Sequence, residues 1–192
     1  MNTREKLVLA AEELMLRDGY SATRVDEVIR KAGLSKGSFY HFFDSKESLG
    51  LAALEHYYAD RVTRLAAGSH ATEPDPLRRA HLFIAHAFRV AEDLWTRGCL
   101  LANFATDAAG SSEIIADALG KKTGELRALL MDLLSPLATP EVTAADLADQ
   151  FLISVEGSIV LARIYGDPAY LQVGLAQFRR CLEKLEGRGT KA

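Results

Sequence analysis

The segment of residues 23–49, TRVDEVIRKAGLSKGSFYHFFDSKESL, constrains the fold more than any other part of the chain. Apolar residues recur at helical spacing up to Gly33, a residue type that ends helices because it tolerates φ > 0. Thr23 can cap the start of this first helix, and the acidic residue three positions later completes a capping box. Ser35 can cap a second short helix, Lys36–Phe43. This order of helix, tight turn and helix is typical of a helix-turn-helix, whose second helix enters the major groove of DNA.

The predicted second helix carries side chains that suit contact with DNA. Lys36 and Ser38 offer donors for phosphates or base edges, and Tyr40 and His41 add a hydroxyl and an imidazole. Gly37 leaves room for the backbone to approach a DNA strand closely. On spacing alone, an ordinary helical hairpin with a polar outer face is an alternative interpretation.

The segment as a whole resembles the tetracycline-repressor (TetR) family of transcriptional regulators. The resemblance covers the first quarter of the chain. It implies an all-α protein of about nine helices, with an N-terminal three-helix DNA-binding head and a C-terminal helical domain for ligand binding and dimerisation. The residues that carry it are Gly19, Tyr20, Thr23, Val25, Glu27, Val28, Ala32, Gly33, Leu34, Ser35, Gly37, Phe39, Tyr40, Phe43, Ser45, Lys46, Glu47 and Leu49.

The resemblance also indicates which residues contact DNA. Lys46 opens a long helix capped by Ser45, and the family uses this lysine and the helix N-terminus on the DNA backbone. Many members have a histidine that touches a phosphate where this chain has Phe42, so His41 or Tyr40 must make that contact or it is absent. We therefore expect DNA contacts from Thr23, Arg24, Lys36, Gly37, Ser38, Tyr40, His41 and Lys46.

Charge alone would not indicate a nucleic-acid-binding protein. The 192 residues are 48% hydrophobic and 26% charged, which is typical of a globular chain with a sizeable core. The formal net charge is −3, and the first 67 residues carry ten basic and ten acidic side chains. DNA binding must therefore rest on the local placement of cations and helix N-termini.

The remaining composition favours a reduced, cytoplasmic protein. Two cysteines do not make a disulfide framework, and the N-terminus has charges inside its apolar stretch, unlike a signal peptide. The longest apolar region, residues 151–165, is interrupted by Glu156 and Arg163, so we expect no membrane span. We expect no cofactor, no metal site and no enzymatic activity.

The rest of the chain is predicted to be helical throughout. The stretch GSHATEPDP, residues 68–76, is the clearest break, and we place the domain boundary just before it: residues 1–67 form the DNA-binding domain with its connecting helix, and residues 68–192 the effector-sensing and dimerisation domain. Thr143 with Asp146 forms a second capping box, and Pro168 suits the first turn of the last helix. The other expected helices span residues 3–17, 46–67, 76–96, 99–109, 113–134, 144–165 and 168–186.

The last two long helices are unusually apolar for the surface of a monomer. Each carries a broad apolar stripe together with small residues, such as Ser158 and Gly174, that allow close helix approach. In the family such a pair docks against its symmetry mate as a four-helix bundle, although both stripes could instead be buried within one chain. A two-fold dimer presents two recognition helices about 34–36 Å apart, which suits a palindromic operator.

Two hypotheses address the signal that the second domain detects. The aromatic run of residues 39–43 and the sequence EHYYA, residues 55–59, resemble the family branch that senses electrophiles such as N-ethylmaleimide. That branch has a Gly-Cys-Leu motif where this chain has Gly98-Cys99-Leu100, and a thiol near a helix N-terminus has a lowered pKa. The alternative is that Cys99 is simply a small hydrophobic residue buried in the core. The branch has a second cysteine where this chain has Asp107, which excludes a disulfide within the helix.

The second hypothesis is a reversible pocket for a small organic effector. Apolar and aromatic side chains with few polar groups are the usual lining of a ligand site, although most of these residues could simply fill the core. With the thiol, the candidate effector residues are Cys99, Trp95, Phe88, Asn103, Phe104, Phe151 and Tyr165.

Together these patterns predict a homodimeric transcriptional repressor that a small-molecule or electrophilic effector releases from its operator. A different class of protein would be a thiol-dependent helical enzyme that uses Cys99 with His81 or His86, but no motif supports this pairing. A helical adaptor that binds protein and not DNA is a further alternative.

Overall fold

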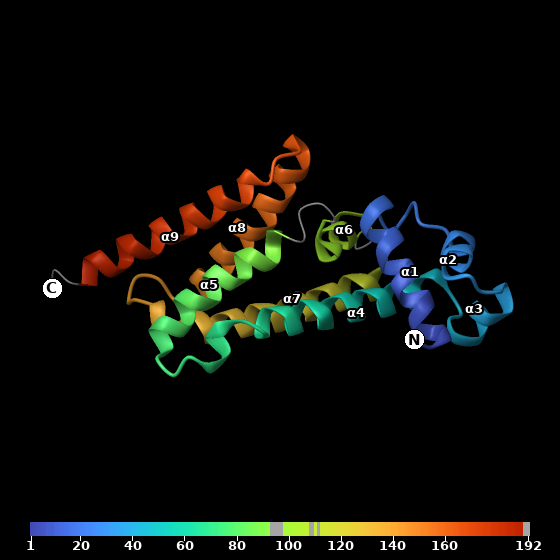
Figure 1. Ribbon diagram of the computed structural model, residues 1–192, viewed down its shortest axis with the longest axis horizontal. Helices are drawn as coiled ribbons and strands as arrows, with labels where there is room; N and C mark the ends of the chain where they lie inside the picture. Colours follow the sequence, from blue (N-terminus) through green and yellow to red (C-terminus); the bar gives the residue numbers. More distant parts are fainter. Residues whose placement is uncertain (93–97, 108–109, 111, 190–192) are drawn as a thin grey trace. The chain divides into compact units, whose positions relative to one another are not determined.

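Every regular element in the described residues, which are 1–92, 98–107, 110 and 112–189 of this computed structural model, is a helix (Figure 1). The all-α prediction is therefore confirmed for this part of the chain. The α-helices are α1 (Thr3–Asp18), α2 (Val25–Ala32), α3 (Lys36–Phe42), α4 (Lys46–Ala66), α5 (Pro76–Glu92), α6 (Leu100–Asp107), α7 (Glu113–Leu134), α8 (Ala144–Tyr165) and α9 (Ala169–Gly189). Short 3₁₀ helices, η1 (Ser69–Thr72) and η2 (Ser135–Leu137), lie in the connections before α5 and α8.

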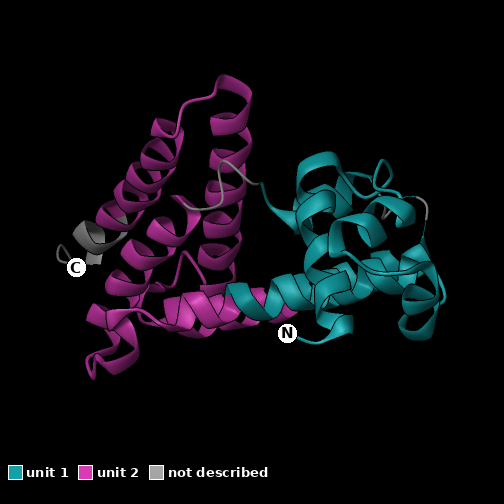
Figure 2. Cartoon of the chain, turned by 45° about the vertical axis from the view of Figure 1, so that its right-hand side comes forward, with its two compact units in different colours: residues 1–61, 97–123 teal, residues 62–96, 124–192 magenta. Residues whose placement is uncertain are grey.

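The helices form two compact units that do not follow the order of the sequence. Unit 1 contains residues 1–61 and 97–123, and unit 2 contains residues 62–96 and 124–192 (Figure 2). Helix α6 therefore packs with the N-terminal helices, although the sequence places it well after the break at residues 68–76. The division of function between residues 1–67 and 68–192 stays a prediction.

Unit 1 is built around α1, which packs against α2, α3 and α6. Its core contains fully or almost fully buried side chains from these helices, including Leu7, Met15, Val28, Phe39 and Phe104. Burial of each large apolar side chain contributes roughly 1.5–3 kcal/mol. This core fixes α2 and α3 relative to α1, so that the outer faces of the two short helices are free to carry polar groups.

The turn between α2 and α3 has the predicted chemistry. Gly33 ends α2 in the left-handed conformation, with φ 67°. Ser35 caps α3, and its hydroxyl accepts a hydrogen bond of 3.1 Å from the backbone N–H of Ser38. The helix-turn-helix geometry is therefore confirmed at the residues that define it.

The predicted cap of α2 is wrong by one residue. Thr23 is buried, and its hydroxyl donates a 2.7 Å hydrogen bond back to the carbonyl of Gly19, so it is not available to cap α2. Arg24 is the N-cap residue instead, and its backbone N–H donates to the carboxylate of Glu27 at 3.3 Å. The acidic partner is therefore Glu27 and not Asp26.

Unit 2 is centred on the antiparallel neighbours α8 and α9, with α5 packed against both. Aromatic rings from three helices meet in its core, where Phe151 lies 5.3–5.8 Å from the centroids of Phe83, Phe88 and Phe178. A side chain at Gly174 would collide with Ser158, which confirms that small residues let α9 approach α8 closely within one chain.

Several details of unit 2 differ from the sequence expectation. The Thr143–Asp146 capping box is present, but α9 begins at Ala169, one residue later than predicted. Leu77, which lies on the apolar face expected for this helix, is 45% exposed. The predicted ends of the helices at residues 96 and 109 lie outside the described residues.

Candidate DNA-binding head and thiol site

Helix α3 is held in unit 1 by aromatic packing on one side. Phe39 is buried, and its ring centroid lies 5.1 Å from that of Tyr40 and 6.0 Å from that of Phe43. The guanidinium of Arg4 covers the Phe43 ring at 5.3 Å, a cation–π distance. These contacts leave the opposite side of α3 at the surface.

The exposed side of α3 carries most of the predicted DNA contacts. Lys36, Gly37 and His41 are exposed, Ser38 is half-buried, and the Tyr40 side chain is 58% exposed. The ammonium of Lys36 lies 3.6 Å from the carboxylate of Asp26, an exposed ion pair that costs little to exchange for a phosphate. A short helix with one cation, two hydroxyls and an imidazole on its outer face can donate to phosphates and base edges.

Phe42 lies on the exposed side as well. It is 40% exposed, and the His41 ring packs edge-on against it with 4.7 Å between centroids. Since Phe42 offers no donor, the polar groups next to it that can reach a phosphate are those of His41 and Tyr40.

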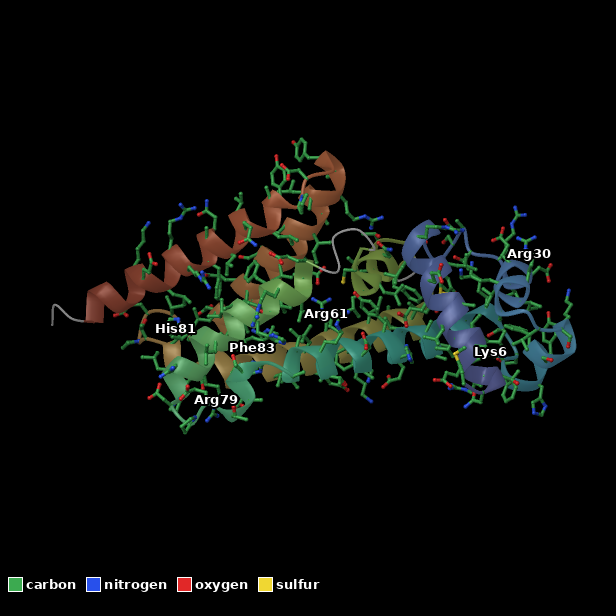
Figure 3. All side chains as sticks on the ribbon, in the orientation of Figure 1. Lys6, Arg30, Arg61, Arg79, His81 and Phe83 are labelled. Carbon is green, nitrogen blue, oxygen red and sulfur yellow. The ribbon has the colours of Figure 1, made fainter. Side chains whose placement is uncertain are left out.

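The two residues before α2 have different environments. Thr23 is buried and its hydroxyl is used within the turn, whereas Arg24 is exposed beside the N-terminus of α2. Sequence reasoning did not single out Arg30, an exposed cation that projects outward from α2 (Figure 3). Its position on the polar face of a short amphipathic helix is the signal that could have found it.

Lys46, the first residue of α4, is held closely by the turn between α1 and α2. Its ammonium donates a 3.0 Å hydrogen bond to the carbonyl of Ser21 and lies 4.5 Å from the centroid of the Tyr20 ring. Partial burial lowers the pKa of Lys46, although the charge of Asp107 opposes this shift. The predicted phosphate contact is therefore a half-buried lysine with a fixed position.

Cys99 lies immediately before α6 and is buried. A nitrogen of the Arg61 guanidinium donates to its sulfur at 3.1 Å, and Arg61 itself is only 7% exposed. A neighbouring cation favours the thiolate, which is the nucleophilic form of cysteine. Sequence reasoning did not single out Arg61.

Helix α6 also carries two of the predicted pocket residues, which contact α1 and the turn after it. The Asn103 amide donates to the carbonyl of Leu16 at 3.1 Å, and the Phe104 ring packs 5.0 Å from the Tyr20 ring. Asn103 and Phe104 thus join α6 to α1 and the following turn, and Cys99 directly precedes the same helix.

The remaining predicted pocket residues lie elsewhere. Phe88 and Phe151 are buried together in the aromatic core of unit 2, whereas Tyr165 is 64% exposed and stacks on Tyr170. Trp95 lies outside the described residues. A surface groove of about 270 Å³ in unit 2 has none of the predicted residues in its lining, which is formed by His81, Ile84, Arg179, Leu182 and Glu183.

Two family models match the chain over these regions. Residues 7–53 match the bacterial regulatory proteins of the tetR family, and residues 76–177 match the C-terminal domain of LmrA/YxaF-like transcriptional regulators. The chain belongs to the TetR family. It is a DNA-binding transcriptional regulator of that family, whose members dimerise and respond to small molecules.

Individual relatives agree with this assignment. The transcriptional regulator AcuR of Cereibacter sphaeroides is 33% identical over 83% of this chain and 76% of its own length. The repressor DhaR of Mycobacterium sp. strain GP1 is 27% identical over 84% of this chain and 82% of its own.

The repressor NemR of Escherichia coli strain K12 is also similar, at 31% identity over 67% of this chain and 65% of its own length. The crystal structure of the reduced form of E. coli NemR superimposes with a TM-score of 0.78 at 25% identity, over 94% of this chain and 97% of that one. This likeness supports the family branch that the sequence resemblance indicated.

Membership of a family of regulators argues against the alternative of a thiol-dependent enzyme. Cys99 belongs to unit 1, whereas His81 and His86 belong to unit 2. Within the described residues, no group of three histidine, cysteine or acidic side chains could hold a metal ion, and no helix is long and apolar enough to cross a membrane.

Proposed function

We propose that this TetR-family regulator is a homodimeric repressor that places α3 of each copy on one half of a palindromic operator. The observation that carries the proposal is the two-sided character of α3: Phe39 anchors the helix in the core, while Lys36, Tyr40 and His41 face outward. A two-fold dimer sets the two recognition helices about one helical turn of DNA apart, so the operator has matching half-sites.

Exposed apolar side chains on α8 and α9 support dimerisation through these helices. The stripes that join α8, α9 and α5 are already buried within the chain, yet a second apolar set faces solvent. This set is Ile153, Val160, Leu161, Ile164 and Val173, of which Ile153 is 72% exposed. Apolar patches of this kind mark interaction sites, and a second copy of the chain is the occupant that the family suggests.

The proposed effector is an electrophile that modifies Cys99. The thiolate adds to the electrophilic carbon of a compound such as a maleimide, the C=C π bond breaks as the C–S bond forms, and the adjacent carbon takes a proton from water. The contact with Arg61 favours the thiolate and is lost when the sulfur becomes a thioether. Because Cys99 is buried, an adduct must also displace its neighbours, which favours a different arrangement of unit 1.

Operator binding is tested by fluorescence anisotropy on DNA selected from a random pool, over a range of salt concentrations. We expect tight binding to the selected site that weakens steeply with salt. Lys36→Ala should weaken binding to all sequences and reduce the salt slope by about one. Lys121→Ala, which removes an exposed charge on α7, is the matched control. Equal affinity for selected and random DNA would rule out the proposed repressor.

The thiol is tested on the same DNA complex with N-ethylmaleimide. We expect release of the wild-type protein and no release of the Cys99→Ser variant, while Cys181→Ser, which removes the other thiol, behaves as wild type. Release that persists in Cys99→Ser would transfer the sensing role to a reversible ligand site of the kind proposed around Phe88 and Phe151. Intact-mass measurement shows which cysteine has been alkylated.

A further inference from the structure

The end of α6 is hydrogen-bonded to the turn between α1 and α2 through Asp107. Its carboxylate accepts a 2.6 Å hydrogen bond from the backbone N–H of Ser21, and its backbone carbonyl accepts a 3.3 Å hydrogen bond from the Ser21 hydroxyl. The carbonyl of Ser21 in turn accepts the 3.0 Å hydrogen bond from Lys46. The main chain of Ser21 is therefore held on one side by α6 and on the other by α4.

The turn is shaped around this carboxylate. Gly19 has φ +89°, and a Cβ at that position would lie 3.0 Å from an oxygen of Asp107. The Thr23 hydroxyl closes the same turn on the Gly19 carbonyl, and Asn103 of α6 donates to the end of α1 at Leu16. Hydrogen bonds from Ser21, aided by the charge of Lys46, lower the pKa of Asp107, so the carboxylate is ionised at neutral pH.

The turn is connected to two sets of groups that the proposed function places on DNA, one along the chain and one by contact. Ser21 precedes Arg24, the N-cap residue of α2, by three positions, and α2 carries α3. Lys46 begins α4 and lies against the Tyr20 ring of the turn. A shift of the turn therefore moves the α2–α3 pair and the half-buried lysine together.

We propose that Asp107 is a positioning residue for operator binding, which holds the α1–α2 turn so that α2, α3 and Lys46 have the geometry the operator requires. The proposal deepens the proposed function and rests on it. Helix α6 joins Cys99 at one end to Asp107 at the other, a span of roughly 12 Å at 1.5 Å per residue. Displacement of α6 by an adduct at Cys99 would thus loosen the grip on Ser21 and release DNA.

The sign of the change in DNA affinity distinguishes a positioning role of Asp107 from a purely electrostatic effect of its charge. An anionic side chain near a phosphate-binding lysine repels DNA, so its removal should strengthen binding if the carboxylate only contributes charge. If the carboxylate positions the turn, its removal should weaken binding to the operator, since the Ser21 N–H loses its acceptor. The two roles predict opposite signs.

The test compares Asp107→Ala, Asp107→Asn and the control Thr106→Ala by anisotropy on the selected operator and on random DNA. Thr106 is exposed, and its hydroxyl donates to the carbonyls of Ala102 and Asn103 in its own helix. We expect Asp107→Ala to lose operator affinity by about tenfold, the factor carried by a hydrogen bond to a charged group, without losing affinity for random DNA. Asp107→Asn keeps a carbonyl acceptor and should lie between Asp107→Ala and wild type, and Thr106→Ala should match wild type.

Hydrogen–deuterium exchange of the free protein provides the structural readout. Amides in the peptide containing residues 19–24 should exchange faster in Asp107→Ala than in wild type, while α8 and α9 are unchanged. Operator binding by Asp107→Ala or Asp107→Asn that equals or exceeds wild type would overturn the positioning role and leave the proposed function intact. Failure of the wild-type protein to select any operator would overturn both, so the two failures are distinguishable.

Discussion

At the scale of single residues, Phe42 shows how one substitution can alter DNA recognition without altering the fold. Its ring is 40% exposed on α3 and contacts His41, so it is not needed to fill the core. A ring at this place offers no hydrogen-bond donor to a phosphate, in contrast to the histidine that the family resemblance leads one to expect.

Phe42→His should therefore strengthen operator binding. One added neutral hydrogen bond contributes roughly 0.5–1.5 kcal/mol, which corresponds to an increase in affinity of about two- to tenfold. Anisotropy on operator and random DNA measures the change, and Phe42→Leu, which removes the ring without adding a donor, is the control. If the two variants bind alike, the imidazole does not reach a phosphate.

At the scale of elements, the sequence predicted the residues that begin and end helices, but it did not predict which helices pack together. Gly33 and Ser35 define the turn between α2 and α3 through their own backbone and side-chain preferences, so a pattern of residue types was sufficient. The cap of α2 was displaced by one residue because Thr23 bonds to Gly19 instead. The attachment of α6 to unit 1 depends on long-range contacts such as Ser21 with Asp107, which no local pattern encodes.

The backbone conformation of each element also determines which glycines of the helix-turn-helix are required for stability. Gly33 has φ 67° with no atom near a built Cβ, so alanine there meets only the cost of the left-handed conformation. Gly37 lies within α3 and does not have a positive φ. A Cβ added at Gly37 would lie 3.8 Å from its nearest neighbour, which is an ordinary van der Waals contact. Gly33→Ala should lower the free energy of unfolding by about 1–2 kcal/mol, while Gly37→Ala should raise it by up to about 1 kcal/mol.

Urea unfolding monitored by circular dichroism, at one fixed protein concentration, distinguishes the two glycine variants by their midpoints. Equal midpoints for Gly33→Ala and Gly37→Ala would show that the turn adjusts to a conformation outside the left-handed region.

At the scale of the whole molecule, a repressor that binds as a dimer couples folding, assembly and DNA affinity, so a change in the stability of unit 2 changes all three. We expect one polar residue in its core to make that stability depend on pH. His70 in η1 is 3% exposed and packs on Phe83, and its Nδ1 has no hydrogen-bond partner among the residues that the structure describes. The facing groups on α5 are His86 and Arg79, both of which disfavour a further positive charge. The Nε2 of His86 is itself hydrogen-bonded to the backbone carbonyl of Arg64 at 2.8 Å.

Burial, reinforced by His86 and Arg79, lowers the pKa of His70 below its ordinary value of 6.5. As the pH falls below 6.5, the unfolded chain takes up the proton first, so the free energy of unfolding should decrease by at most about 1.4 kcal/mol per pH unit. Above 6.5 both states are neutral at this residue and the contribution is constant. His70→Gln should flatten the dependence between pH 6.5 and 5, whereas His81→Gln, at an exposed position of α5, should leave it intact. Urea midpoints measured across this range decide the matter, and a slope that survives in His70→Gln would assign the proton uptake to other groups.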